Sequence, residues 1–153
     1  MRFRTLGVAL AAVAALLTLP APAVTAAPAA AAADVPLSQG RTATASSTES
    51  AVYAAGLAVD GDTGTRWSSA ASDNQWLRVD LGASATVSQV VLRWEAAYAA
   101  DYRIQFSQDG STWTDARKVT GSDGGTDTVD VSGGARHVRV YADRRATQWG
   151  ISL

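Results

Sequence analysis

Apolar and polar residues alternate in short runs along most of the chain after residue 74. The runs cover residues 75–81, 86–95, 102–107, 113–119 and 136–142. Successive side chains of a β-strand point to opposite faces of the sheet, so this alternation is typical of strands that bury one face. Each run is therefore predicted to be a strand.

Glycine-containing turn signals separate these runs. They lie at Gly82, 109–110, 122–125 and 132–134. The Asp-Gly pair at 109–110 is of the kind that closes β-hairpins. Two more polar segments, 37–47 and 126–131, predict short strands at sheet edges, and the pattern contains no amphipathic helix of normal length. Several short strands with turns between them predict an all-β sandwich or barrel.

The apolar phase of each run predicts which side chains form the core. The inward set is Leu77, Val79, Leu81, Val90, Leu92, Trp94, Ile104, Phe106, Val138 and Val140. Tryptophan buries a large area, so Trp67, Trp76 and Trp113 are expected in the core together with Trp94.

The first 33 residues do not share this pattern. Arg2 and Arg4 precede an apolar run at 6–19, and small residues follow Pro20. This order is typical of a secretory signal peptide, with an Ala/Pro-rich lead-in up to residue 33. A membrane anchor is the alternative, but the run is shorter than the ~20 residues that span a bilayer. We therefore expect a secreted, extracellular protein without stable membrane insertion, whose domain occupies residues 34–153.

Charge and cysteine content narrow the function classes. Loss of Arg2 and Arg4 with the signal peptide leaves 11 basic residues against 14 acidic ones, a net charge of −3. No basic patch stands out, so we expect no nucleic-acid partner. The chain has no cysteine, and a secreted domain without disulfides depends on its core, on a metal or on both. We expect the module to be a monomer.

One turn, residues 60–67, crowds oxygen donors and glycines into eight positions. Asp60, Asp62 and Thr65 lie close enough for a tight loop to direct several oxygens inward, which suits a hard cation such as Ca²⁺. A plain surface turn is the alternative, since Asp-Gly is a common turn dipeptide. The turn is not an EF-hand, because Thr65 and Ala71 stand where that loop needs glycine and glutamate.

The residues give little support to catalysis. His137 is the only histidine and lies in a predicted strand, and the chain has neither cysteine nor a G-x-S-x-G motif. Glu49 and Glu95 are the only glutamates, and nothing in the sequence indicates the raised pKa that a glycosidase acid needs. We therefore predict that the chain is not an enzyme.

Binding is better supported. Glu49, Tyr53, Arg66, Glu95, Tyr98 and Trp149 lie in or beside predicted loops. Aromatic faces can pack on the C–H face of a sugar ring, while Arg and Glu fix its hydroxyl groups. The alternative is that Arg66 pairs with a carboxylate to hold its loop, and that Tyr98 and Trp149 are structural.

The chain from about residue 37 to its end resembles the coagulation factor 5/8 type C (discoidin) domain. The motifs that carry the resemblance lie at 60–67, 75–82, 94–98, 107–113, 136–140 and 147–153, in the family's order. The branch that it resembles most is the bacterial carbohydrate-binding module family 32. The resemblance implies a galactose-binding-like jelly-roll β-sandwich.

The resemblance also implies a structural Ca²⁺. Its ligands would be the carbonyl of Leu57, the Asp60 carboxylate, the Asp62 position and Thr65. Further ligands of the family lie beyond Leu153, so we expect the domain to be C-terminally truncated by about one strand.

A sugar site is implied at Glu49, Arg66, Glu95 and loop aromatics. Two acids favour a cationic sugar such as a glucosamine polymer, although Ala71 and Ile151 stand where similar modules carry aromatics. The sequence thus predicts a secreted, non-catalytic carbohydrate-binding module that tethers an enzyme or cell-surface protein to polysaccharide. The alternative is an adhesion module that binds protein or lipid head groups at a cell surface, which the short polar loops disfavour.

Overall fold

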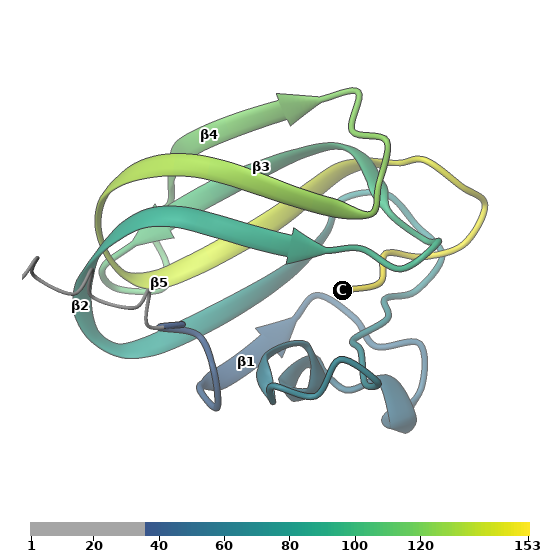
Figure 1. Ribbon diagram of the computed structural model, residues 1–153, viewed down its shortest axis with the longest axis horizontal. Helices are drawn as coiled ribbons and strands as arrows, with labels where there is room; N and C mark the ends of the chain where they lie inside the picture. Colours follow the sequence, from purple (N-terminus) through teal and green to yellow (C-terminus); the bar gives the residue numbers. More distant parts are fainter. Residues whose placement is uncertain (1–35) are drawn as a thin grey trace, which may run out of the picture. The chain divides into compact units, whose positions relative to one another are not determined.

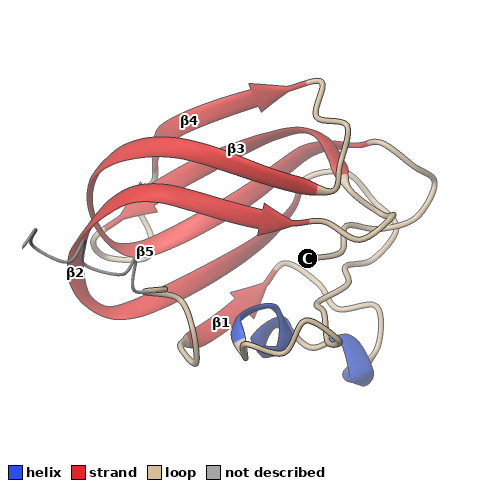
Figure 2. Cartoon of the chain, viewed as in Figure 1, coloured by secondary structure: helices blue, strands red, loops and turns tan. Residues whose placement is uncertain are grey.

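Antiparallel strands form one hydrogen-bonded sheet in the order β1-β2-β5-β3-β4 in the computed structural model, which describes residues 36–153. The elements are β1 (Thr42–Ala45), η1 (Ala51–Tyr53), η2 (Ala55–Val59), β2 (Gln75–Arg93), β3 (Ala99–Ser107), β4 (Thr114–Thr120) and β5 (Thr126–Arg145). The two short 3₁₀ segments lie beside β1 (Figure 2). The predicted signal peptide and lead-in, residues 1–33, lie outside the described residues.

Two long strands turn this single sheet into a sandwich. The first part of β2 pairs with β1 on one side and with the last part of β5 on the other. A register shift between Asp80 and Ala85 follows, after which β2 pairs only with the first part of β5, from Ala85↔Ala135 to Arg93↔Thr126. Both strands curl back at the left of Figure 1, so their two halves lie in opposite layers. The all-β, galactose-binding-like sandwich is thereby confirmed.

The turns predicted at Gly82 and at 132–134 are wrong. Both lie inside continuous strands, β2 and β5, where they bend the chain instead of ending the strand. Gly82 has φ +83°, a conformation that disfavours other residues, and a side chain at Gly133 would lie 3.1 Å from the ring of Phe106. Glycine in a strand interior often marks a bulge or a tight bend.

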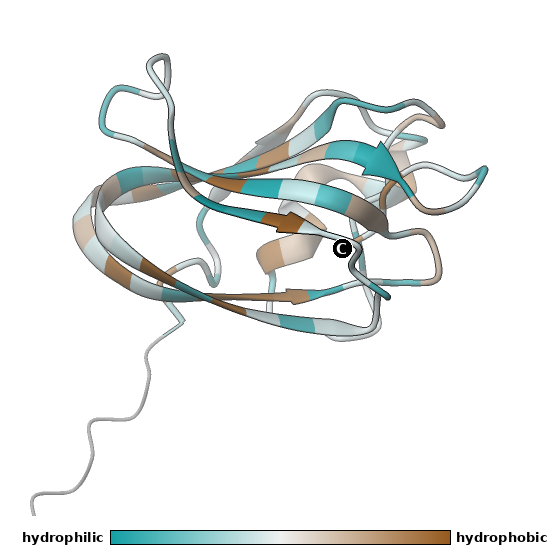
Figure 3. Cartoon of the chain, turned by 90° about the horizontal axis from the view of Figure 1, so that it is seen from above, coloured by the Kyte–Doolittle hydropathy of each residue, from teal (hydrophilic) through white to brown (hydrophobic). Residues whose placement is uncertain are grey.

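The core lies between the two layers and follows the predicted phases. Its largest buried members include Trp67, Leu77, Leu92, Trp94, Tyr102, Ile104, Phe106, Val140 and Ile151. Val90 and Val138 are partly buried against it. Hydropathy alternates along the strands as the sequence predicts (Figure 3). The edge position of β1 is confirmed, and so is that of residues 126–131, which pair only with β2.

Trp76 and Trp113 are not in the core, which corrects the prediction. Leu77 faces the core, so its neighbour Trp76 faces outward. The guanidinium of Arg139 lies 4.0 Å from the ring centroid of Trp113 and 6.0 Å from that of Trp76. These rings therefore stabilise the outer face of the sheet by cation–π contacts.

Candidate functional site

A short ladder of backbone hydrogen bonds crosses the end of the sandwich opposite the strand bends. The Glu49 amide donates to the Ser68 carbonyl at 2.8 Å, Ser68 forms a bridge with Ser152, and the Glu95 amide donates to the Ser152 carbonyl at 3.2 Å. Segments far apart in sequence thus lie side by side. Adjacent strands are separated by about 4.8 Å, which places the Glu49 and Glu95 backbones roughly 14 Å apart.

Each glutamate carboxylate is held by one of its two oxygens. The Ser68 hydroxyl donates to Oε2 of Glu49 at 2.7 Å, and the Ala97 amide donates to Oε2 of Glu95 at 3.1 Å. The Oε1 atoms accept no hydrogen bond from the described residues. Each carboxylate is therefore oriented and keeps an oxygen for a ligand.

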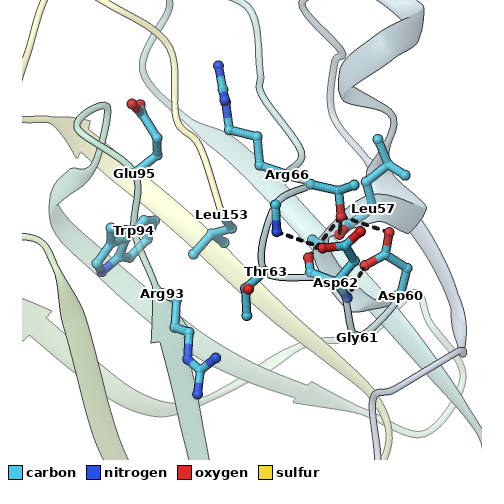
Figure 4. A pocket seen from close by; sticks show the side chains of 13 residues that line it. Leu57, Asp60, Gly61, Asp62, Thr63, Arg66, Arg93, Trp94, Glu95 and Leu153 are labelled. Carbon is cyan, nitrogen blue, oxygen red and sulfur yellow. Dashed lines mark hydrogen bonds between the residues drawn. The ribbon is translucent and has the colours of Figure 1, made fainter.

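Arg66 lies on the same face of this ladder. It precedes Ser68 by two positions in an extended segment, so both side chains point to the same side. Its guanidinium rests over the ring of Tyr53, 4.4 Å from the centroid, and its Nε is buried without a hydrogen-bond partner. Among residues 36–153 it forms no ion pair. Arg66 and Glu95 project to the same side, away from the turn at Asp60 (Figure 4).

Trp149 and Tyr98, two of the aromatic residues predicted to contact a ligand, differ in how exposed they are. Trp149 is 62% exposed and precedes Gly150, where a side chain would lie 2.2 Å from the Ser69 carbonyl. This close packing holds the backbone that carries Trp149 against Ser69 and Ala70. Tyr98 is half-buried, and its ring packs on Gly124, so it has less surface to offer a ligand.

A salt bridge fixes the loop that carries Trp149. The Arg145 Nε donates to Asp73 at 3.0 Å, and its Nη1 donates to the carbonyls of Gln148 and Trp149 at 3.1 and 3.2 Å. The Arg145 amide, with its side chain, holds the pKa of Asp73 below its ordinary value. Arg145 therefore joins the loop that contains Asp73 to the loop that carries Trp149.

The turn predicted to bind Ca²⁺ gathers oxygens around one hydroxyl. The Thr65 Oγ1 lies 2.8 Å from a carboxylate oxygen of Asp60, 2.9 Å from the Asp62 carbonyl and 3.3 Å from the Leu57 carbonyl. One hydroxyl proton can satisfy only one of these acceptors. The remaining lone pairs form an oxygen set of the kind that a hard cation takes, so the residues present fit the ion.

The Asp62 carboxylate does not join this set. Its Oδ1 accepts from the Gly64 amide at 2.8 Å, and Asp62 contributes its carbonyl instead. The Asp62 amide and the Thr65 hydroxyl lower the pKa of Asp60 and keep it anionic. No three acidic or histidine side chains gather as metal ligands within residues 36–153, so a cation here depends on carbonyl and hydroxyl oxygens as well. The Ca²⁺ itself stays a prediction.

An open pocket of about 360 Å³ joins this turn to Arg66 and Glu95, two of the residues predicted to bind a sugar. Its walls include the turn itself, Arg66, Arg93, Trp94, Glu95 and Leu153 (Figure 4).

A buried polar network supports the segment that carries Glu95. The carboxylate of Asp127 accepts hydrogen bonds from Trp94, Tyr102 and Ser122 at 2.7 to 2.8 Å. Sequence analysis did not identify Asp127 or Ser68, and it named Tyr53 as a loop aromatic of the binding set but not as a support for Arg66. The two-residue spacing of Arg66 and Ser68 in an extended segment was the one available signal.

The match to known proteins covers this whole region. The model of the F5/8 type C domain matches residues 42–153. The chain belongs to the F5/8 type C domain family. The resemblance seen in the sequence is thereby confirmed.

Two solved structures that are 42–46% identical to this chain are binding modules. Chitosan-binding module 1 from a chitosanase/glucanase of Paenibacillus sp. IK-5 is 46% identical, with 76% of this chain and 92% of that chain covered and a TM-score of 0.74. Module 2 of the same enzyme, solved with chitotriose, is 42% identical, with 76% and 94% covered and a TM-score of 0.74. A family 32 module of Clostridium perfringens, at 21% identity, 73% and 93% coverage and a TM-score of 0.62, shares the fold.

A curated relative places such a segment in a much larger protein. A polysaccharide lyase 8 family protein of Enterococcus faecalis is 41% identical over 71 residues, which are 46% of this chain and 5% of the lyase. The chain therefore spans a small part of that relative. The F5/8 type C domain of the present chain is a binding module. Among the described residues, no helix is long and apolar enough to cross a bilayer.

Proposed function

We propose that this chain is a secreted carbohydrate-binding module that holds an enzyme or a cell-surface protein on an amino-sugar polysaccharide such as chitosan. The observation that carries the proposal is the convergence of Glu49, Arg66 and Glu95, from three distant segments, on one end of the sandwich. The 42–46% identity to modules described as chitosan-binding supports the same ligand class.

The chemistry of the site suits a glucosamine chain. The free oxygens of Glu49 and Glu95 accept charge-assisted hydrogen bonds from ammonium groups, which are stronger than those from neutral donors. Arg66, which has no acidic partner in the described residues, donates to hydroxyl or ring oxygens. The exposed indole of Trp149 offers a flat apolar surface to the C–H face of a sugar ring.

Secretion and tethering are parts of the same proposal. The basic start, short apolar run and small residues of positions 1–33 support export. The partial match to a polysaccharide lyase supports attachment to a polysaccharide-active protein.

Ca²⁺ belongs to this proposal as a structural ion. Leu57, Asp60, Asp62 and Thr65 would hold it. An ion bound there would cross-link the turn that leads directly into Arg66, stabilising the folded state.

The direct test compares three trisaccharides by calorimetry: the glucosamine trimer, its N-acetylated form and cellotriose. The amine form is expected to bind most tightly. Glu49→Gln and Glu95→Gln are each expected to weaken it roughly tenfold, about the contribution of one charge-assisted hydrogen bond. The matched control is Asp130→Asn. Asp130 is an exposed acid on β5 that lies closer to the strand bends than to the end with Glu49 and Glu95, so its replacement is expected to leave affinity unchanged.

Two results would contradict the proposal. One is equal affinity for all three trisaccharides; the other is an equal response of the Glu49, Glu95 and Asp130 variants. Binding to anionic lipid vesicles without any glycan binding would support the adhesion alternative instead.

A further inference from the structure

The Arg66 guanidinium is held by an aromatic ring and by no acid. Its central carbon lies 4.4 Å from the centroid of the Tyr53 ring, and Arg66 takes part in none of the ion pairs among residues 36–153. A guanidinium stacked on a ring has its plane fixed, so its N–H donors point edgewise in defined directions. An arginine paired with a carboxylate would have those donors occupied.

Tyr53 is itself anchored to the segment that carries Arg66. The Ser68 amide donates to the Tyr53 carbonyl at 3.2 Å, and the Tyr53 amide donates to the Ser50 carbonyl at 3.0 Å within η1. The backbone segments that carry the ring and the guanidinium are therefore held together by a hydrogen bond two residues beyond Arg66.

One donor of Arg66 has no acceptor. Its Nε is buried, and no described residue accepts from it. Buried donors are normally paired, so the unpaired Nε indicates that Arg66 is not placed to serve a contact within the chain. Arg66 and Glu95 line the same open pocket, so the side chain that carries this donor lies at the proposed sugar site.

We propose that Tyr53 is a positioning residue for sugar binding: its ring holds Arg66 so that the guanidinium donates to ligand oxygens instead of pairing with Glu49 or Glu95. The inference rests on the proposed function of the site. Glu49 and Glu95 are then both left free for ammonium groups, because the Arg66 guanidinium is held by the face of the Tyr53 ring.

The test separates the ring from the hydroxyl group. Tyr53→Phe keeps the ring and is expected to bind the glucosamine trimer like the wild type. Tyr53→Leu keeps an apolar side chain without a π face and is expected to bind about tenfold more weakly, which corresponds to a cation–π contact shielded from water. In an Arg66→Ala background, Tyr53→Leu is expected to have no further effect on affinity.

A spectroscopic measurement tests the stacking without any ligand. The Arg66 Nε–H signal in ¹⁵N-resolved NMR is expected to be shifted by the ring in the wild type and in Tyr53→Phe, and to lose that shift in Tyr53→Leu. A structural role of Tyr53 alone would lower the melting temperature without moving this signal selectively.

The outcomes are distinct. Full affinity of Tyr53→Leu, or an equal loss from it in the Arg66→Ala background, would overturn the inference, since Tyr53 would then act independently of Arg66. If the wild type binds no glycan, the proposed function fails, and the Nε–H signal alone decides whether Tyr53 orients Arg66. An unchanged signal in Tyr53→Leu would overturn it in that case too.

Discussion

Replacement of Asp127 by leucine should measure how much the polar network around this carboxylate, which supports the Glu95 segment, contributes to the free energy of unfolding. One oxygen of Asp127 accepts from the Trp94 indole at 2.8 Å, the Tyr102 hydroxyl at 2.7 Å and the Ser122 hydroxyl at 2.8 Å. Leucine has a similar volume but accepts no hydrogen bond. All three donors then lose their partner at once.

The expected loss follows from the burial of those donors. Trp94 is 7% exposed and Tyr102 is fully buried, so water replaces the half-buried carboxylate poorly there, whereas Ser122 is half-buried and can reach solvent. Two stranded donors at about 1–3 kcal/mol each lower the free energy of unfolding by about 4 kcal/mol. For a domain of this size that corresponds to a fall in Tm of roughly 15 °C.

Urea unfolding of the variant measures this loss. Tyr102→Phe, which removes one donor and leaves the carboxylate, should cost about 1 kcal/mol. Asp130→Ala, an exposed acid on the same strand, should cost less than about 0.5 kcal/mol. A loss of under about 1 kcal/mol in Asp127→Leu would refute the reasoning, because two buried donors would then be satisfied without Asp127.

The same network predicts a dependence on pH. Burial alone would raise the pKa of Asp127, but the donors from Trp94, Tyr102 and Ser122 together outweigh it and lower that pKa. The stabilisation is thus complete above the ordinary carboxyl pKa of 3.8 and is lost as pH falls through the lower pKa of the folded state. Asp127→Leu should abolish this part of the acid sensitivity in unfolding measured at pH 5 and pH 3.

Three further predictions concern other carboxylates. Added Ca²⁺ should raise the Tm of the wild type and of Asp123→Ala but not of Asp60→Ala, and an equal rise in all three would remove the metal assignment. Asp73→Asn, which weakens the link to Arg145, should reduce affinity for the glucosamine trimer roughly twofold to fivefold, the range of an exposed ion pair, with a matching change in Trp149 fluorescence on binding. Arg136 and the Gly82 amide lower the pKa of Asp80 to about 2, so the stabilisation that Asp80 gives is present above pH 3.8 and is lost between pH 4 and pH 2. Asp80→Asn should therefore reduce the change in the free energy of unfolding with pH within that window only.

The strands were predictable because period-two alternation depends only on which face is buried. Leu77 and Val79 face the core as their phase requires, and Trp76 faces outward for the same reason. Trp76 and Trp113 were misplaced because side-chain size was given more weight than phase. Their stacking on Arg139 depends on pairing between strands, which local sequence does not determine.

The continuity of β2 and β5 could not be predicted locally. Glycine allows positive φ both in a turn and in a strand bend, so Gly82 and residues 132–134 look the same in either case. Whether the strand continues depends on a partner many residues away, as in the pairing of Val87 with Gly133. Local composition therefore predicts where the chain bends, but not whether that bend separates two strands or lies within one continuous strand.

The candidate site was predictable only as a set of residue types. Glu49, Arg66 and Glu95 came from loops and from the family resemblance, and the structure adds the ladder through Ser68 and Ser152 that brings their segments together. The stacking of Tyr53 on Arg66 depends on how the 3₁₀ segments fold back. No periodic pattern in the sequence encodes that contact.

The most direct test of the account is a chemical-shift map of the protein titrated with the glucosamine trimer. The amides of Glu49, Ser68 and Glu95, the Arg66 Nε–H and the Trp149 indole should shift together and saturate at one common ligand concentration, while the outer face around Arg139 stays unchanged. Absence of saturable shifts at these positions, or saturable shifts confined to the Arg139 face, would contradict the assignment of this end of the sandwich as the sugar site.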